Sequence, residues 1–234
     1  MHDRLREFPD AKAMVTSLAD EIVARLKGGV AERGHASMAV SGGTTPGVLF
    51  DALSERNAPW DKVWITLSDE RWIAPDQDGS NEHLARTRLL RGRAVKAHFV
   101  GLKTGDATPD AGAAKANAAI SAFPRPFDVM LLGMGDDGHT ASLYPHAPEL
   151  KAALDTKAPA LVHAVHAQSA AATGDRMTLT LRTIMDSRWI VLLIKGAAKM
   201  QTYRAAEDGD DIAEMPVRAI LSRSAVPVDV FWAP

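Results

Sequence analysis

Short apolar runs of strand length alternate with longer, helix-like segments along most of the chain, and this alternation restricts the fold more than any other feature. Many of the runs are rich in Val, Ile and Leu, whereas a strand with one face in water alternates apolar and polar residues. Such runs are typical of strands that are buried on both faces of a parallel sheet. The predicted strands are residues 36–41, 62–68, 95–100, 127–132, 160–166, 176–181, 189–194 and 228–232.

The segments between these runs predict helices. Apolar residues recur along residues 10–27 as a single stripe, and Gly28-Gly29 is expected to end that helix. Pro216 lies inside the last predicted helix and is expected to weaken it. The other predicted helices are residues 46–56, 81–91, 108–122, 197–207 and 212–223.

Together these elements predict an α/β fold with a doubly wound, mostly parallel sheet and helices on both faces. The run RMTLTL at 176–181 does alternate apolar and polar residues, so we expect a small antiparallel excursion near residues 160–181. No repeat, low-complexity tract or linker interrupts the pattern. The sequence therefore predicts a single domain over residues 1–234.

Charge and composition narrow the class of partner. The 27 basic and 29 acidic residues give a net charge of −2, which offers no case for nucleic acid or an anionic membrane as a main partner. Without cysteine there is no disulfide or thiolate chemistry, and no His, Asp or Glu pattern has metal-ligand spacing. No apolar run approaches the roughly 20 residues of a membrane span. We expect a cytoplasmic protein with neither metal nor cofactor, acting as a monomer, with a dimer as the alternative.

The stretch SGGTTP at 41–46 lies between a predicted strand and a predicted helix, where open α/β sheets bind ligands. Gly42 and Gly43 let the backbone approach a ligand closely, and Ser41 and Thr44 add hydroxyl groups. The free N–H groups of the following helix favour an anion such as phosphate. The alternative is a tight turn capped by a threonine, and the stretch alone does not decide between them.

A second polar stretch, SDERW at 68–72, directly follows the predicted strand 62–68. Arg71 can hold a carboxylate or phosphate through two parallel hydrogen bonds. Asp69 or Glu70 can orient that guanidinium or accept hydrogen bonds from sugar hydroxyls. The competing interpretation is an ion pair that closes the end of the strand.

The most distinctive stretch, GMGDDGHTASLYP at 133–145, contains the spacing G-x-G-x-x-G after a predicted strand. A dinucleotide loop would place Asp136 and Asp137 against a pyrophosphate, which like charge disfavours. The acidic residue expected about 20 positions later, Asp155, precedes the next strand instead of closing it. An oxidoreductase that binds a nicotinamide cofactor is therefore disfavoured.

The same stretch is better suited to presenting a histidine. His139 follows two aspartates in a glycine-rich loop, and histidine exchanges protons near neutral pH. Asp137, two residues earlier, can fix the imidazole tautomer as a catalytic partner, or contact the ligand. The alternative is a helix cap formed by Asp136 or Asp137, with an incidental histidine.

Two basic residues follow at later junctions. Arg176 opens the predicted strand 176–181, and Lys199 lies in the first turn of the predicted helix 197–207. A positive charge opposes the dipole at a helix N-terminus, so Lys199 suggests an anionic ligand there. A solvated lysine is the alternative, and Lys195 has a similar claim.

These stretches together resemble the family of glucosamine-6-phosphate isomerases and 6-phosphogluconolactonases, and its lactonase branch in particular. They occur in the family's order and span most of the chain. The matching residues are SGGTTP at 41–46, SDERW at 68–72, SN at 80–81, GMGDDGHTASLYP at 133–145, DRMTLTL at 175–181 and GAAKM at 196–200.

The resemblance implies hydrolysis of 6-phospho-D-glucono-1,5-lactone to 6-phosphogluconate in the oxidative pentose phosphate pathway, without a cofactor. The small-molecule sugar-phosphate lactone would be the only partner. By the same resemblance His139 would be the general base. The implied substrate contacts are Ser41, Gly42, Gly43, Thr44, Asp69 and Arg71, with Arg176 and Lys199 holding the phosphate.

Two other functions remain as alternatives. Glucosamine-6-phosphate deaminases, in the same family, typically carry DEY and GHIAFNEP where this chain has DERW and GHTASLYP. The deaminase glutamate thus falls at Tyr144, which favours the lactonase, although lactonases more often have Phe there. A non-catalytic sugar-phosphate-binding protein would keep the binding residues but could dispense with His139.

Overall fold

The computed structural model describes residues 4–169, 172–222 and 225–234. Within these residues seven strands form one parallel sheet in the order β1-β10-β9-β6-β2-β3-β5. The predicted mostly parallel sheet is confirmed. The strands are β1 (Leu5–Glu7), β2 (Ala36–Val40), β3 (Val63–Leu67), β5 (His98–Val100), β6 (Val129–Leu132), β9 (Ile190–Lys195) and β10 (Val228–Ala233).

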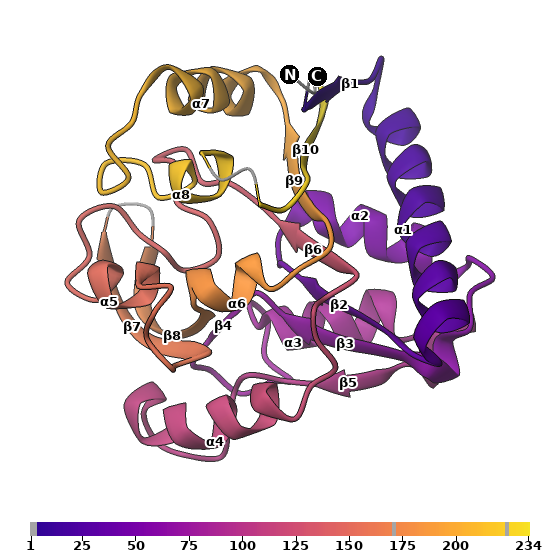
Figure 1. Ribbon diagram of the computed structural model, residues 1–234, viewed down its shortest axis with the longest axis horizontal. Helices are drawn as coiled ribbons and strands as arrows, with labels where there is room; N and C mark the ends of the chain where they lie inside the picture. Colours follow the sequence, from indigo (N-terminus) through magenta and orange to yellow (C-terminus); the bar gives the residue numbers. More distant parts are fainter. Residues whose placement is uncertain (1–3, 170–171, 223–224) are drawn as a thin grey trace.

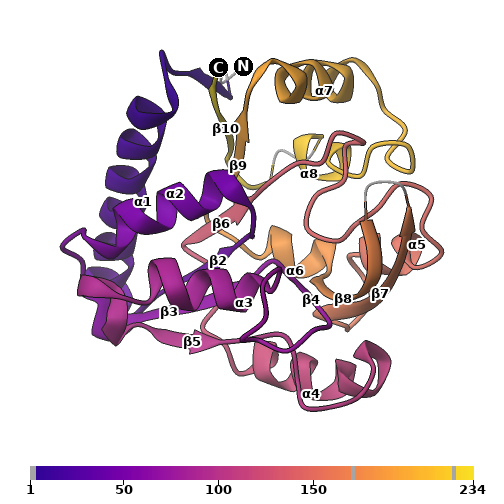
Figure 2. The ribbon, with the colours of Figure 1, turned by 180° about the vertical axis from the view of Figure 1, so that it is seen from behind.

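Helices cover both faces of this sheet, as predicted. Figures 1 and 2 show α1 and α2 on one side of the sheet, and α6, α7 and α8 on the other. No helix in the described ranges is long and apolar enough to cross a membrane. The helices are α1 (Ala11–Arg33), α2 (Thr44–Ser54), α3 (Asn81–Leu84), α4 (Pro109–Ser121), α5 (Leu150–Leu154), α6 (Leu181–Met185), α7 (Ala197–Asp208) and α8 (Arg218–Leu221).

A second, smaller sheet is antiparallel. It contains β4 (Asp69–Arg71), β8 (Ala172–Leu179) and β7 (Val162–Ser169), in that order. The predicted antiparallel excursion near residues 160–181 is therefore confirmed. The polar stretch at 69–71, expected to be a strand end, is itself the third strand of this sheet.

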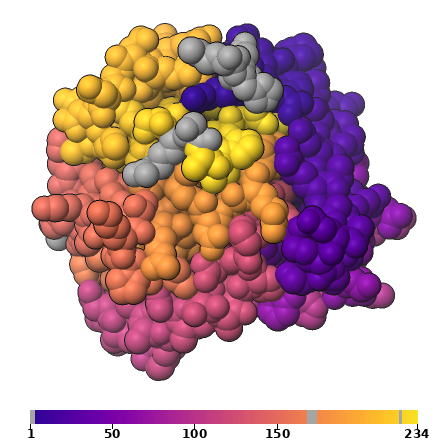
Figure 3. All heavy atoms as spheres, viewed as in Figure 1, coloured from indigo at the N-terminus to yellow at the C-terminus, as the bar shows by residue number. Residues whose placement is uncertain are grey.

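The strand order places a switch point between β2 and β6. From β2 the chain proceeds outward to β3 and β5, whereas from β6 it proceeds to β9 and β10 on the other side. Loops leave the carboxyl ends of β2 and β6 in opposite directions, which is where open α/β sheets bind ligands. At the sheet edge, β1 pairs with β10, so the first and the last strand lie side by side, and indigo and yellow regions adjoin near the top of the face seen in Figure 3.

The prediction that Gly28-Gly29 ends the first helix is wrong. Helix α1 continues to Arg33 and ends at Gly34, whose φ of 80° is left-handed. Gly29 is buried where the helix passes close to Asp128, and Arg33 beyond it pairs with that carboxylate. The glycine thus permits a close approach between helix and sheet, and the ion pair lies one turn further on.

We expect Gly28→Ala to raise the free energy of unfolding by about 0.5–1 kcal/mol, because nothing lies within 4 Å of the added methyl group and alanine favours a helix. The neighbouring Gly29→Ala should lower it by about 1–3 kcal/mol, because its methyl group would lie 2.9 Å from Asp128 Oδ1. Urea unfolding of both variants checks the pair. Equal effects would show that helix propensity alone governs these positions.

Other predicted elements are shorter than expected. Within 212–223 only Arg218–Leu221 is helical, after Pro216, and residue 223 lies outside the described ranges. The predicted strand 95–100 begins at His98, because residues up to Lys96 form a 3₁₀ turn. The predicted helix 81–91 is one α-helical turn followed by a π-helical turn.

Candidate active site

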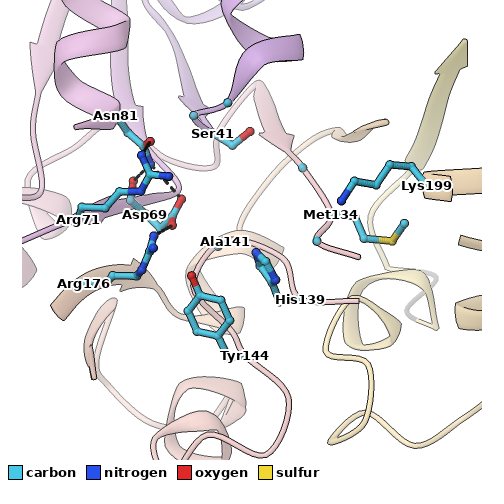
Figure 4. Close-up of a pocket in the computed structure, with 14 residues that line it drawn as sticks. Ser41, Asp69, Arg71, Asn81, Met134, His139, Ala141, Tyr144, Arg176 and Lys199 are labelled. Atoms are coloured by element: carbon cyan, nitrogen blue, oxygen red, sulfur yellow. Dashed lines mark hydrogen bonds and ion pairs between the residues drawn. The ribbon is translucent and has the colours of Figure 1, made fainter. Parts of the chain in front are cut away.

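A pocket of about 320 Å³ opens at the switch point, beside the loops that follow β2 and β6. Eight of the ten site residues expected from the sequence line it, and Figure 4 draws the lining residues as sticks. Residues from the loops after β2 and β6, from the small sheet and from helix α7 therefore meet at one place. The lining residues are Ser41, Gly42, Gly43, Asp69, Arg71, Asn81, Gly133, Met134, Gly135, His139, Ala141, Tyr144, Arg176 and Lys199.

The loop after β2 contributes backbone and one hydroxyl group. Gly43 caps α2 with a φ of 116° and without a side-chain hydrogen bond, so the alternative of a threonine-capped turn is wrong. Ser41 is 6% exposed and its hydroxyl has no hydrogen-bond partner in the protein, so it is free to bond to a ligand. Thr44 begins α2 and is not among the lining residues.

The small sheet brings two arginines together. Strands β4 and β8 pair so that Arg71 lies opposite Arg176 and Asp69 lies opposite Thr178. Like charges directly opposite each other are destabilising unless an anionic group compensates. Asp69 partly does so, because its Oδ2 lies 4.0 Å from Arg176 Nη1. Arg176 is 8% exposed and its Nε has no partner, so this guanidinium can still take a further acceptor.

Glu70 supports this wall from behind. Its side chain is fully buried and accepts hydrogen bonds from the backbone N–H groups of Arg71 (2.8 Å), Asn81 (2.7 Å) and Glu82 (2.7 Å), and from the Ser80 hydroxyl (2.9 Å). Burial raises the pKa of Glu70, and the four donors oppose that effect. Glu70 therefore fixes the start of α3 against β4 and does not face the pocket.

Asn81 completes the same wall. Its Nδ2 donates to the Asp69 carbonyl oxygen at 2.8 Å, and its Oδ1 accepts from Arg71 Nη1 at 3.2 Å. An added Cβ on Gly42 would lie 1.9 Å from that Oδ1, so glycine is required for the loop to pass. The sequence shows SN at 80–81 only as part of a resemblance, and nothing in it indicates this bridging role.

His139 and Asp137 form a direct pair. The Asp137 carboxylate accepts from the His139 backbone N–H at 3.1 Å and lies 2.5 Å from Nδ1 of the ring. Burial raises the pKa of Asp137, but the hydrogen bonds from His139 outweigh it and leave that pKa below its usual range. Asp137 thus contacts the histidine and is not among the pocket-lining residues. No helix begins here, so the alternative of a helix cap is wrong.

Gly135 makes room for this pair. An added Cβ would lie 2.1 Å from His139 Nδ1 and 2.6 Å from Asp137 Oδ1. The ring then packs against Tyr144, with 4.6 Å between ring centroids. Ala141, on the same loop, has a φ of 49°, a conformation that is uncommon outside glycine and tends to occur at functional sites. The glycine-rich loop therefore places His139 at the pocket, with Asp137 beside its ring.

Lys199 lies on the opposite side of the pocket from Arg176, with His139 between them (Figure 4). Its Nζ lies 2.7 Å from Asp136, a carboxylate that is 81% exposed. The two cations that the resemblance assigns to one phosphate thus line the same pocket from different walls. In the described ranges no group of three or more His, Cys, Asp or Glu side chains is arranged to hold a metal ion.

Comparisons with known proteins agree with one another. A model of the family described as glucosamine-6-phosphate isomerases/6-phosphogluconolactonase matches residues 9–232. The chain is 42% identical to a 6-phosphogluconolactonase of Rhizobium meliloti (strain 1021) over all of both chains. It is 43% identical to one of Mesorhizobium japonicum, covering 97% of this chain and 94% of the other. A crystal structure of a 6-phosphogluconolactonase from Shewanella baltica superposes with a TM-score of 0.95, at 45% identity, covering 98% of this chain and 97% of that one.

Proposed function

Because the chain belongs to the family of glucosamine-6-phosphate isomerases and 6-phosphogluconolactonases, we propose that it hydrolyses 6-phospho-D-glucono-1,5-lactone to 6-phosphogluconate, a step of the oxidative pentose phosphate pathway. One observation carries the proposal: a histidine that is paired with an aspartate lines a pocket, and three cationic side chains line the same pocket. A base and positive charge are what the hydrolysis of an anionic lactone needs.

His139 acts as the general base in the proposed mechanism. It removes a proton from water as the water oxygen bonds to C1 of the lactone, while Asp137 holds Nδ1 and stabilises the imidazolium. The bond between C1 and the ring oxygen then breaks, and the proton passes from His139 to that oxygen, which becomes the C5 hydroxyl. Arg176, with its buried and unpartnered Nε, is placed to stabilise the negative charge that develops at C1.

Electrostatics suggest which end of the lactone each wall receives. Asp69 is buried and fixed by a 2.6 Å hydrogen bond from the Ser142 hydroxyl, so a phosphate beside it would be repelled by a charge that cannot move. Asp136, beside Lys199, is exposed and can turn into water. We therefore place the phosphate at Lys199, with Ser41 and the loop of Gly42 and Gly43, and the lactone ring between His139 and Arg176. This revises the hypothesis that Arg176 holds the phosphate.

The deaminase alternative is less well supported by the site. Tyr144, and not a carboxylate, packs against His139 at the position of the deaminase glutamate. Ring opening of an amino sugar would therefore lack its acidic partner. Measurement of ammonia release from glucosamine 6-phosphate would reveal that activity.

A hydrolysis assay tests the proposal. Freshly generated 6-phosphogluconolactone is mixed with the protein, and the rate is corrected for spontaneous opening of the ring. We expect rapid, saturable hydrolysis, which requires neither an added metal nor a nucleotide. A rate no faster than the spontaneous one would overturn the proposal and would favour a protein that only binds sugar phosphates.

Lys199→Ala separates phosphate binding from chemistry. We expect KM for the phosphorylated lactone to rise about 10–100-fold with a small change in kcat, because the lost contact is remote from C1. Hydrolysis of glucono-1,5-lactone, which has no phosphate, should be unchanged. Lys195→Ala serves as the matched control, because Lys195 is the last residue of β9 and does not line the pocket. An equal loss on both lactones would place Lys199 at the reacting end.

A further inference from the structure

The hydroxyl group of Tyr144 has a place in the pocket that the proposed mechanism does not use. Tyr144 is 3% exposed, yet it lines the pocket, and Figure 4 shows its hydroxyl end pointing toward Arg176 and Asp69. Its ring lies beside His139, with 4.6 Å between centroids, and the Arg176 guanidinium carbon lies 5.6 Å from the ring centre. Tyr144 therefore joins the base to the wall that carries Asp69.

The polar groups around this hydroxyl form a defined corner. Asp69 contributes a carboxylate that only accepts hydrogen bonds when ionised, whereas Arg176 contributes donors only. Burial raises the pKa of Tyr144, against the effects of the neighbouring Arg176 and Ser142, so the phenol keeps its proton at neutral pH. A ligand atom in this corner must therefore both donate to the carboxylate and accept from a donor.

Only one type of oxygen meets this requirement. A hydroxyl group both donates and accepts, whereas a carbonyl oxygen or a ring oxygen only accepts. The proposed mechanism puts the lactone ring between His139 and Arg176, and the Tyr144 ring packs against His139 while its hydroxyl end points toward Arg176 (Figure 4), so on this placement the hydroxyl faces the groups beside C1. In the lactone, C1 is bonded to the carbonyl oxygen and to the ring oxygen, and the neighbouring C2 carries a hydroxyl. Of these three the C2 hydroxyl alone can satisfy Asp69 and Tyr144 together.

We propose that Tyr144 is a specificity-determining residue, whose hydroxyl donates a hydrogen bond to the C2 hydroxyl of the lactone while that group donates to Asp69. The inference rests on the proposed function, because it takes C1 to be the atom that His139 serves. The protein would then recognise the hydroxyl group on C2, the carbon next to the reacting centre. The phosphate at Lys199 and the C2 hydroxyl at Tyr144 would then fix both ends of the substrate.

A comparison of two proteins, the wild type and one variant, on two substrates tests this inference. The wild-type protein and Tyr144→Phe are each assayed on 6-phosphogluconolactone and on its 2-deoxy analogue, with both rates corrected for spontaneous hydrolysis. Phenylalanine keeps the ring that packs against His139. We expect the wild-type preference in kcat/KM for the 2-hydroxy substrate to shrink roughly 10-fold in Tyr144→Phe, as loss of one hydrogen bond would do. The 2-deoxy lactone should be hydrolysed almost equally by both proteins.

The controls separate the possible failures. Tyr203→Phe removes the hydroxyl of the other tyrosine, which is buried in α7 away from the pocket, and should leave the preference unchanged. An equal fall on both lactones in Tyr144→Phe would show a purely structural role and overturn the inference, as would no change on either. If the wild-type protein hydrolyses neither lactone, the proposed function itself fails.

Discussion

Replacing His139 by alanine is expected to lower kcat by about 100–10,000-fold, the usual contribution of a positioned general base. KM should change little, because the cationic side chains that bind the substrate stay in place. The side chain is partly exposed in the pocket, so its removal leaves no buried cavity and the fold should survive. Steady-state hydrolysis of 6-phosphogluconolactone, with a thermal melt of each sample, checks both statements.

Two further variants define what the histidine does. Asp137→Asn keeps an acceptor for Nδ1 but removes the charge, so we expect a smaller loss of kcat than in His139→Ala. His83→Ala removes a histidine of α3 that does not line the pocket, and should leave kcat unchanged. Near-normal turnover in His139→Ala would show that another group activates the water.

The large sheet could be predicted from the sequence because its strands are buried on both faces. Runs such as residues 127–132 and 189–194 consist almost entirely of apolar residues, and both contain strands whose ends lie within two residues of the predicted ones. The end of α1 could not be predicted, because Gly29 is needed for the close approach of the helix to Asp128, which is distant in the sequence, and does not end the helix. Strand β4 was missed for a similar reason, since a three-residue polar strand exists only through its pairing with β8.

The residues of the site were easier to find than their arrangement. Short glycine-rich loops are easy to recognise in the sequence, and His139 lines the pocket with Asp137 paired to its ring. Which wall each side chain belongs to depends on long-range pairing. Arg71 faces Arg176 through the register of β4 and β8, and Lys199 reaches in from α7 on the other side. No local pattern contains that information.

The carboxylate of Glu70 should prove the most important single group for the stability of the pocket wall. Four donors converge on it in a fully buried position, and three of them are backbone N–H groups. Glu70→Ala is expected to lower the free energy of unfolding by about 3–5 kcal/mol, because several buried donors would be left without an acceptor. Urea unfolding monitored by tryptophan fluorescence measures the loss.

Glu70→Gln distinguishes shape from charge at this position. The amide keeps the volume of the side chain and one acceptor oxygen, but it places an NH₂ group against donors, so we expect a loss of about 1–3 kcal/mol. Asp76→Asn, which changes an exposed carboxylate between β4 and α3, should alter the free energy of unfolding by less than about 0.5 kcal/mol. Because Glu70 binds the N–H groups of Arg71 and Asn81, both of which line the pocket, hydrolysis should weaken in Glu70→Gln even where the protein remains folded. A folded Glu70→Gln with unchanged kcat/KM would show that the wall keeps its geometry without the carboxylate charge.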